Sequence, residues 1–104
     1  MSAQAKERRL HPRKPYRTRV VFEDEFGDGL FYVWSEDFSQ GGIFLESEVP
    51  VRLGTMLYLS FTIPSHKRPI RVTGEVVRIA GGGMGIRFMG LSETAMKRLY
   101  DFLS

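Results

Sequence analysis

The sequence contains no cysteine and only two histidines, and these absences remove most of the chemistry that a small protein can carry. Without cysteine there is no disulfide framework and no thiol nucleophile. His11 and His66 lie in polar, proline-flanked segments, and the carboxylates are scattered rather than clustered with them. Neither a metal site nor a catalytic base is therefore indicated. We expect a protein that is not an enzyme and that holds no metal and no cofactor.

Long hydrophobic runs are also missing. No stretch approaches the length of a membrane-spanning helix, and the polar N-terminus lacks the apolar core of a signal peptide. We therefore expect no membrane insertion and a cytoplasmic location. The 104 residues, of which 42% are hydrophobic and 26% charged, fit one globular domain.

Charge is present, but it is unevenly placed along the chain. The net charge is +3, a mild bias towards anionic partners. The basic residues crowd the start of the chain: Lys6, Arg8, Arg9, Arg13, Lys14, Arg17 and Arg19. The acidic residues crowd the next segment: Glu23, Asp24, Glu25, Asp28, Glu36, Asp37, Glu46 and Glu48. This division has two readings, a solvated surface or an anion site beside a carboxylate.

Six short segments have the composition of strands. They are 16–22, 30–35, 43–47, 56–63, 70–79 and 84–89, separated by turns that include the three glycines at 81–83. Strict alternation marks 56–63 as half-buried, and the long segment 70–79 is expected to change its buried face near Gly74. Short strands with tight turns favour a mostly β fold, a small six-stranded antiparallel β-barrel.

The C-terminal segment differs from the rest because its apolar residues recur at helical spacing. Ser92 suits an N-cap and Glu93 a first turn, while Ala95, Leu99 and Phe102 share one face. We predict a C-terminal α-helix that packs on the barrel, with a partner-binding helix as the alternative. The domain division is then a flexible basic N-terminal arm over 1–14 and the barrel with its helix over 15–104.

The stretch 37–42, Asp-Phe-Ser-Gln-Gly-Gly, lies where one strand stops and the next begins. On an extended backbone Asp37 and Ser39 leave one face and Phe38 the other, so burial of Phe38 would present a carboxylate and a hydroxyl together on the outside. Gly41 and Gly42 permit positive φ and close approach of a backbone or a ligand. Such residues are also common in ordinary polar turns.

A second pattern near the N-terminus, Arg9-x-x-x-Arg13, makes a functional role for the stretch 37–42 more specific than an ordinary turn. Together with Asp37-x-Ser39-x-x-Gly42 it resembles the RxxxR and DxSxxG motifs of bacterial PilZ domains, and the later Gly-Ile-Arg-Phe at 85–88 resembles the family's closing strand. The resemblance covers nearly the whole chain. RxxxR alone carries no information in a basic leader, but the pair of motifs on a six-strand pattern is fairly specific.

The resemblance implies a receptor or adaptor for the second messenger cyclic di-GMP, with a downstream protein partner. It implies that the arginine arm closes over ligand held against the barrel. The ligand-binding residues expected on this basis are Arg8, Arg9, Arg13, Asp37, Ser39, Gly41 and Gly42. An arginine just before RxxxR, here Arg8, is associated in the family with two stacked copies of the ligand. The alternative for Arg8 is a solvated tail residue and one copy.

Another class of function also fits the composition, a small-barrel protein that binds single-stranded nucleic acid. Tyr16, Phe31, Tyr32 and Trp34 would supply its stacking surfaces. Such proteins need exposed aromatic rings on a basic face, whereas this aromatic segment leads into an acidic one. We expect most of these four side chains in the core, and we expect no DNA or RNA partner.

Overall fold

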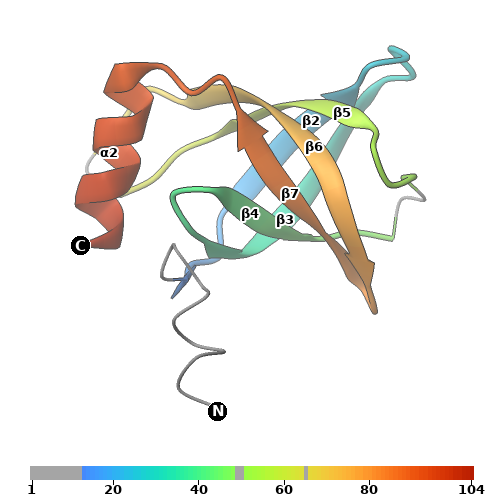
Figure 1. Ribbon diagram of the computed structural model, residues 1–104, viewed down its shortest axis with the longest axis horizontal. Helices are drawn as coiled ribbons and strands as arrows, with labels where there is room; N and C mark the ends of the chain where they lie inside the picture. Colours follow the sequence, from blue (N-terminus) through green and yellow to red (C-terminus); the bar gives the residue numbers. More distant parts are fainter. Residues whose placement is uncertain (1–12, 49–50, 65) are drawn as a thin grey trace.

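The computed structural model of the protein describes residues 13–48, 51–64 and 66–104. Arg8 and Arg9 lie outside these residues, as does most of the expected N-terminal arm. Within the described ranges, no helix is long and apolar enough to cross a bilayer. The elements in chain order are β1 (Lys14–Pro15), β2 (Arg19–Asp24), β3 (Leu30–Phe38), β4 (Gly42–Glu46), β5 (Met56–Phe61), β6 (Ile70–Ala80), β7 (Gly83–Met89) and α2 (Glu93–Leu103) (Figure 1).

The predicted six-stranded antiparallel barrel is confirmed. The strands follow the order β3-β2-β5-β6-β7-β4, and β4 pairs again with β3, which closes the sheet on itself. The two-residue strand β1 is an addition that the sequence analysis did not anticipate, and it pairs with the far end of β3. Closure leaves few exposed strand edges, and it places β1, β3, β4 and β7 side by side.

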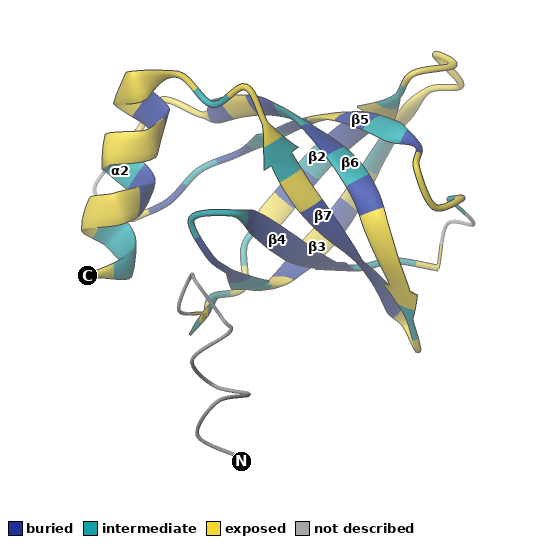
Figure 2. Cartoon of the chain, in the orientation of Figure 1, coloured by how far each residue is buried: buried dark blue, intermediate teal, exposed yellow. Residues whose placement is uncertain are grey.

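Alternation of side chains explains why these segments form a barrel wall. In β5, Leu57, Leu59 and Phe61 are buried and the residues between them are half-buried or exposed. In β6 the buried series continues through Gly74 to Val76, so the expected change of face at Gly74 is wrong. Instead, an irregularity lies between Val76 and Arg78, where an extra residue shifts the pairing with β7, and no second buried face follows it. The end of β6 beyond it is exposed (Figure 2).

The helix α2 covers one end of the barrel, as predicted (Figure 1). Ser92 is the N-cap, and its Oγ accepts a hydrogen bond of 3.1 Å from the backbone N–H of Ala95. Ala95 and Leu99 are buried in the core cluster, and the ring of Phe102 lies 5.9 Å from that of Phe38, centroid to centroid. The apolar face of α2 is therefore part of the core rather than a free partner-binding surface.

Candidate functional site

The segment 37–42 forms the turn from β3 into β4. Phe38 is completely buried, and a register shift between Ser35 and Asp37 inserts one extra residue into β3 just before it. Because neighbouring residues on a strand point to opposite faces, the burial of Phe38 turns Asp37 outward. The expected opposition of these two side chains is confirmed.

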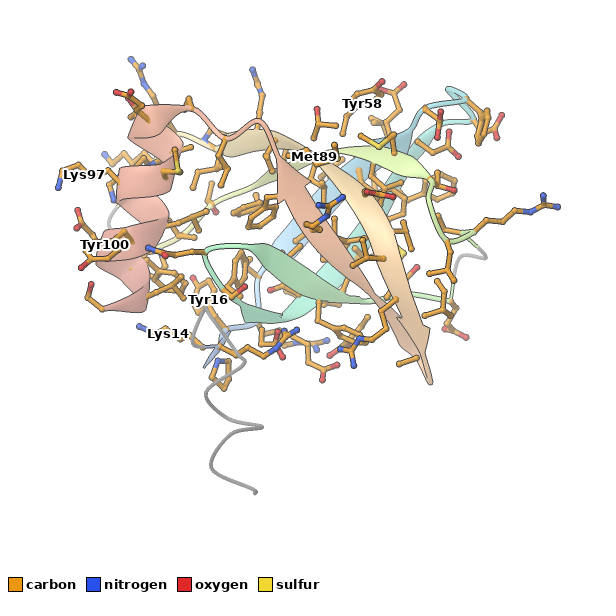
Figure 3. The ribbon with its side chains drawn as sticks, viewed as in Figure 1. Lys14, Tyr16, Tyr58, Met89, Lys97 and Tyr100 are labelled. Atoms are coloured by element: carbon orange, nitrogen blue, oxygen red, sulfur yellow. The ribbon has the colours of Figure 1, made fainter. Side chains whose placement is uncertain are left out.

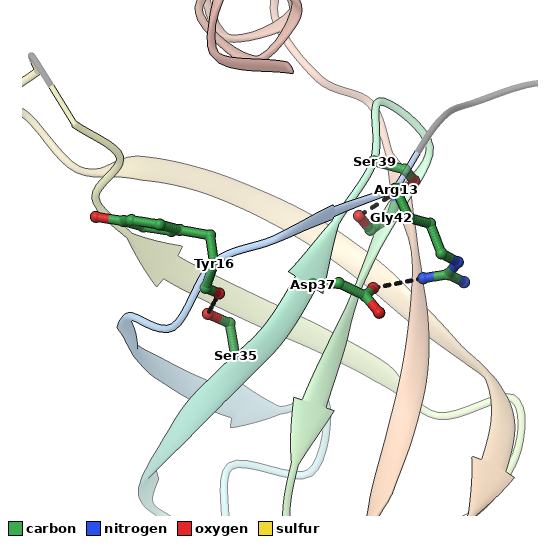
Figure 4. Close-up of polar contacts among 6 residues, drawn as sticks. All are labelled: Arg13, Tyr16, Ser35, Asp37, Ser39 and Gly42. Atoms are coloured by element: carbon green, nitrogen blue, oxygen red, sulfur yellow. Dashed lines mark hydrogen bonds and ion pairs between the residues drawn. The ribbon is translucent and has the colours of Figure 1, made fainter.

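Asp37 makes an ion pair with Arg13, and this contact joins the two sequence motifs (Figure 4). Arg13 Nη1 lies 2.5 Å from Asp37 Oδ1, and the side chains are 36% and 24% exposed, so water still reaches both. The pairing of β1 with β3 sets Pro15 opposite Asp37 and Lys14 opposite Phe38. The backbone of β1 thereby delivers Arg13 to the outer side of β3.

A second residue of β3, Ser35, which the sequence analysis missed, holds residues 16–18 against this strand by hydrogen bonds. Ser35 is completely buried, and its Oγ donates to the backbone oxygen of Tyr16 at 2.6 Å (Figure 4). The same Oγ accepts from the backbone N–H of Thr18 at 2.9 Å. The sequence signal was a serine two residues after Val33 in an aromatic, β-branched strand, a position that alternation places on the same face as Val33. A hydroxyl buried on that face needs hydrogen-bond partners.

Ser39 does not present its hydroxyl on the outside as expected. The residue is 8% exposed, and its Oγ accepts a hydrogen bond of 3.1 Å from the backbone N–H of Gly42. The backbone N–H of Ser39 also donates to the backbone oxygen of Gly42 at 2.8 Å. The physical reason is the tight turn itself, which folds the serine back over its own loop. Ser39 borders the cleft described below but is largely committed to shaping the turn.

The two glycines of this turn have different contacts. Gly41 accepts a hydrogen bond of 2.8 Å from the backbone N–H of Phe88, which fixes the loop to β7. Gly42 is buried, and its φ lies outside the positive range. A Cβ at this position would collide with the backbone oxygen of Ile86. Glycine is therefore required at position 42 for the close approach of the β7 backbone and not for a positive φ.

Beside this turn lies an open cleft of about 600 Å³. It is lined by Arg13, Ser39, Gly41, Gly42, Ile43, Val77, Arg78, Gly85, Ile86 and Arg87. Four of the expected site residues, Arg13, Ser39, Gly41 and Gly42, therefore border one hollow, and Asp37 reaches it through its ion pair with Arg13.

Two arginines in this cleft were not among the expected site residues. Arg87 is ion-paired with Glu75 at 2.6 Å. The guanidinium of Arg78 lies over the ring of Phe44, 5.2 Å from its centroid. Gly85 pairs with both Phe44 and Arg78, so strand register brings these two groups to either side of it. Basic residues on late strands carry no sequence signal for the cleft, because strand register alone places them there.

The aromatic residues divide evenly, so the expectation that most of them lie in the core is wrong. Tyr16 and Phe31 are partly buried against the core. Tyr32 and Trp34 are 61% and 38% exposed, because β3 has one face outside the barrel. The guanidinium groups of Arg17 and Arg19 lie over the ring of Trp34, 4.6 and 4.9 Å from its centroid.

Metal ligands do not gather in the part of the chain that is described. No group of three or more histidine or acidic side chains in that part is arranged to hold an ion. His66 is half-buried in the connection between β5 and β6, and His11 lies outside the described residues. The cleft therefore offers arginine, carboxylate and backbone groups, which suit the binding of an anion with hydrogen-bonding edges.

Comparison with known proteins gives a family match over almost the whole chain. A family profile described as "PilZ domain" matches residues 7–104. A comparison with functionally curated proteins found no match.

Solved structures with the same fold include three from different bacteria. The inhibitor of motility MotI/DgrA of Bacillus subtilis superposes with a TM-score of 0.79 at 19% identity, over 91% of this chain and 49% of that one. The PilZ domain of YcgR from Escherichia coli, solved with c-di-GMP, gives 0.76 at 14% identity over 92% and 88%. PlzA of Borreliella burgdorferi, solved in complex with c-di-GMP, gives 0.72 at 15% identity over 99% and 44%. The chain thus spans about half the length of the first and third of these proteins.

The packing of Gly42 gives a test of its structural role. Gly42→Ala should lower the free energy of unfolding by about 1–3 kcal/mol, because the added methyl group is forced against the backbone of β7. Gly81→Ala is the matched control: this exposed glycine has open space where a Cβ would lie, so the change should be within about 1 kcal/mol. Chemical denaturation of both variants measures the difference, and equal stabilities would contradict the assignment.

Proposed function

This chain belongs to the PilZ domain family, and on that premise we propose that it is a non-catalytic receptor or adaptor domain for cyclic di-GMP. Two of the structurally similar proteins, the PilZ domain of YcgR and PlzA, were solved with this ligand. Their identities to this chain are 14% and 15%, so the proposal for this chain depends on its own site. We place the protein in the cytoplasm of a bacterium, where it would pass the signal to a protein partner.

The observation that carries the proposal is the ion pair between Arg13 and Asp37, which joins the RxxxR and DxSxxG motifs at one cleft. Arginine forms bidentate hydrogen bonds with phosphate oxygens and with O6 and N7 of guanine, and its planar guanidinium group can stack on a base. The carboxylate of Asp37 suits the N1–H and N2–H donors of guanine. Cyclic di-GMP carries two phosphates and two guanines, so both halves of the pair have a partner on it.

The exposure of this pair makes an exchange of partners feasible. A water-accessible ion pair contributes roughly 0–1 kcal/mol, so little stability is lost when Arg13 leaves Asp37 for a phosphate. In the ligand-free protein the two side chains neutralise each other and hold Arg13 and β1 close to the cleft. The ligand then replaces one charge-assisted contact by several.

The other groups of the cleft extend this site. Arg78 and Arg87, the latter paired with Gly42 of the turn, add positive charge to the cleft, partly offset by Glu75. The N-terminal arm over residues 1–14 would bring Arg8 and Arg9, and its closure over the ligand is part of the proposal. Ser39, Gly41 and Gly42 form the rigid side, because their hydrogen bonds and packing fix the turn against β7.

Binding of single-stranded nucleic acid is the second candidate, and the exposure of Tyr32 and Trp34 favours it. Arg17 and Arg19 lie over the ring of Trp34, which restricts stacking of a base on that ring. Arg17 is also paired with Glu46 at 2.7 Å, so part of the positive charge is already neutralised. These contacts support the cyclic di-GMP site over a nucleic-acid surface.

The two candidates separate in one pair of titrations. Calorimetry should give a saturating binding heat with cyclic di-GMP and none with a single-stranded oligonucleotide at matched salt, because the arginine cleft suits the phosphates and guanines of the small ligand whereas Arg17 and Arg19 cover the ring of Trp34. Absence of hydrolysis products after prolonged incubation would agree with a receptor. Heat from the oligonucleotide alone would reverse the order of the two candidates.

The two halves of the motif pair should both matter for affinity. Arg13→Ala should cost about 1.5–3 kcal/mol of binding free energy, roughly tenfold or more in Kd, by removing a charge-assisted contact. Asp37→Ala should also weaken binding, through lost recognition of guanine. Arg52→Ala is the control, because Arg52 is exposed and lies outside the cleft. Wild-type affinity in either site variant would remove that residue from the site.

The number of ligands per chain should depend on Arg8. We expect two copies of cyclic di-GMP per wild-type chain and about one in Arg8→Ala. A second copy brings two more phosphate charges, which a third guanidinium can pair with or stack on. Calorimetric stoichiometry at known active concentration measures both numbers. Saturation of the wild-type chain at one ligand would leave Arg8 as a solvated tail residue and keep the rest of the site.

A further inference from the structure

We propose that Lys14 is a positioning residue that couples the cyclic di-GMP site to the C-terminal end of α2. The inference rests on the proposed function, because Arg13, the residue just before it, is the expected ligand contact. Lys14 touches neither the cleft nor Asp37; it reaches the opposite way, to the helix (Figure 3).

The contact of Lys14 with α2 has two components. Its Nζ donates a hydrogen bond of 2.9 Å to the backbone oxygen of Phe102, and it lies 4.5 Å from the centroid of the Phe102 ring. The last carbonyl groups of a helix have no partner within the helix and carry its partial negative charge. The last turn of α2 contains no basic residue, so Lys14 supplies from the start of the chain the cation that this helix end lacks.

Tyr16, two residues after Lys14, strengthens the contact between this segment and α2. The ring of Tyr16 packs edge-on against that of Phe102 at 5.1 Å and lies 6.0 Å from that of Phe38. Phe38 is the neighbour of Asp37 in β3 and is completely buried. Residues 13–16 therefore contact Asp37 on one side and the last turn of α2 on the other.

The strand between these contacts has a short backbone ladder. β1 has two residues, and Pro15 has no N–H to donate. The N–H of Tyr16 donates to the backbone oxygen of Glu36 at 3.1 Å, just outside the strand. Ser35 adds the contacts with Tyr16 and Thr18 described above. The side chains of Arg13, Lys14 and Tyr16 supply the rest of the attachment, so a shift of one of these is passed to its neighbours.

Coupling between two sites is reciprocal by thermodynamic necessity. If ligand at Arg13 fixes β1, it also fixes Lys14 on α2 and protects the last turn of the helix. If the contact of Lys14 is removed, β1 is held less well and the ligand must order it, which weakens binding. Binding of ligand in the cleft thereby changes the stability of the last turn of α2, although α2 does not line the cleft.

Hydrogen exchange tests both directions. The amide of Ser104 donates to the backbone oxygen of Tyr100 at 3.1 Å and reports on the last turn of α2. In the wild-type chain, saturating cyclic di-GMP should slow its exchange, and Lys14→Met should abolish that slowing and raise the Kd on the order of fivefold. Lys14→Arg keeps the cation and should restore both effects. Lys97→Met is the matched control, because Lys97 lies on α2 and pairs with Asp101.

The outcomes separate this inference from the proposed function. A wild-type chain that does not bind cyclic di-GMP overturns the proposed function; the ligand-free exchange of Ser104, faster in Lys14→Met than in Lys97→Met, still decides whether Lys14 holds the helix end. A wild-type chain that binds with unchanged Ser104 exchange overturns the coupling alone. Wild-type affinity and full ligand-induced protection in Lys14→Met would do the same.

Discussion

The burial of Phe38 is the constraint on which the geometry of this protein depends. Its side chain is completely buried between the rings of Tyr16, Phe61 and Phe102. Once Phe38 points inward, the alternation of the strand turns Asp37 outward. The same residue pairs with Lys14 of β1 and Ile43 of β4, so it fixes β1, the turn and the helix relative to one another.

The cleft combines a rigid side and an exchangeable side. The rigid side is the turn into β4, where the hydroxyl of Ser39 and the close packing of Gly42 against β7 leave little freedom. The exchangeable side is the water-accessible pair of Arg13 and Asp37. For the proposed receptor, such a division would limit the entropy lost on binding to the preformed surface and would let the weak internal contact give way to the ligand.

Several residues show where prediction from the sequence succeeded and where it failed. Alternation located the strands, and the N-cap of α2 was predicted at Ser92. The change of buried face expected in β6 near Gly74 does not occur; the strand instead has an irregularity after Val76 and is exposed over residues 77–79, and a bulge cannot be read from alternation in one strand. Ser39 was expected outside because an extended backbone was assumed as far as this residue; the chain turns there and buries it. Most of the four aromatic side chains were expected in the core, but Tyr32 and Trp34 lie on the exposed face of β3, and composition alone does not separate the two faces of that strand.

The sequence by itself determined the class of fold, the family resemblance and the chemical types in the cleft, since these depend on periodicity and on local motifs. It also determined that Asp37 opposes Phe38, because that follows from adjacency on a strand. Only the tertiary structure decided that Arg13 meets Asp37, that Arg78 and Arg87 line the same hollow, and that Lys14 reaches Phe102. The physical reason is register: contacts between residues far apart in the chain depend on which strands pair and at which residue, and that is set by closure of the whole barrel.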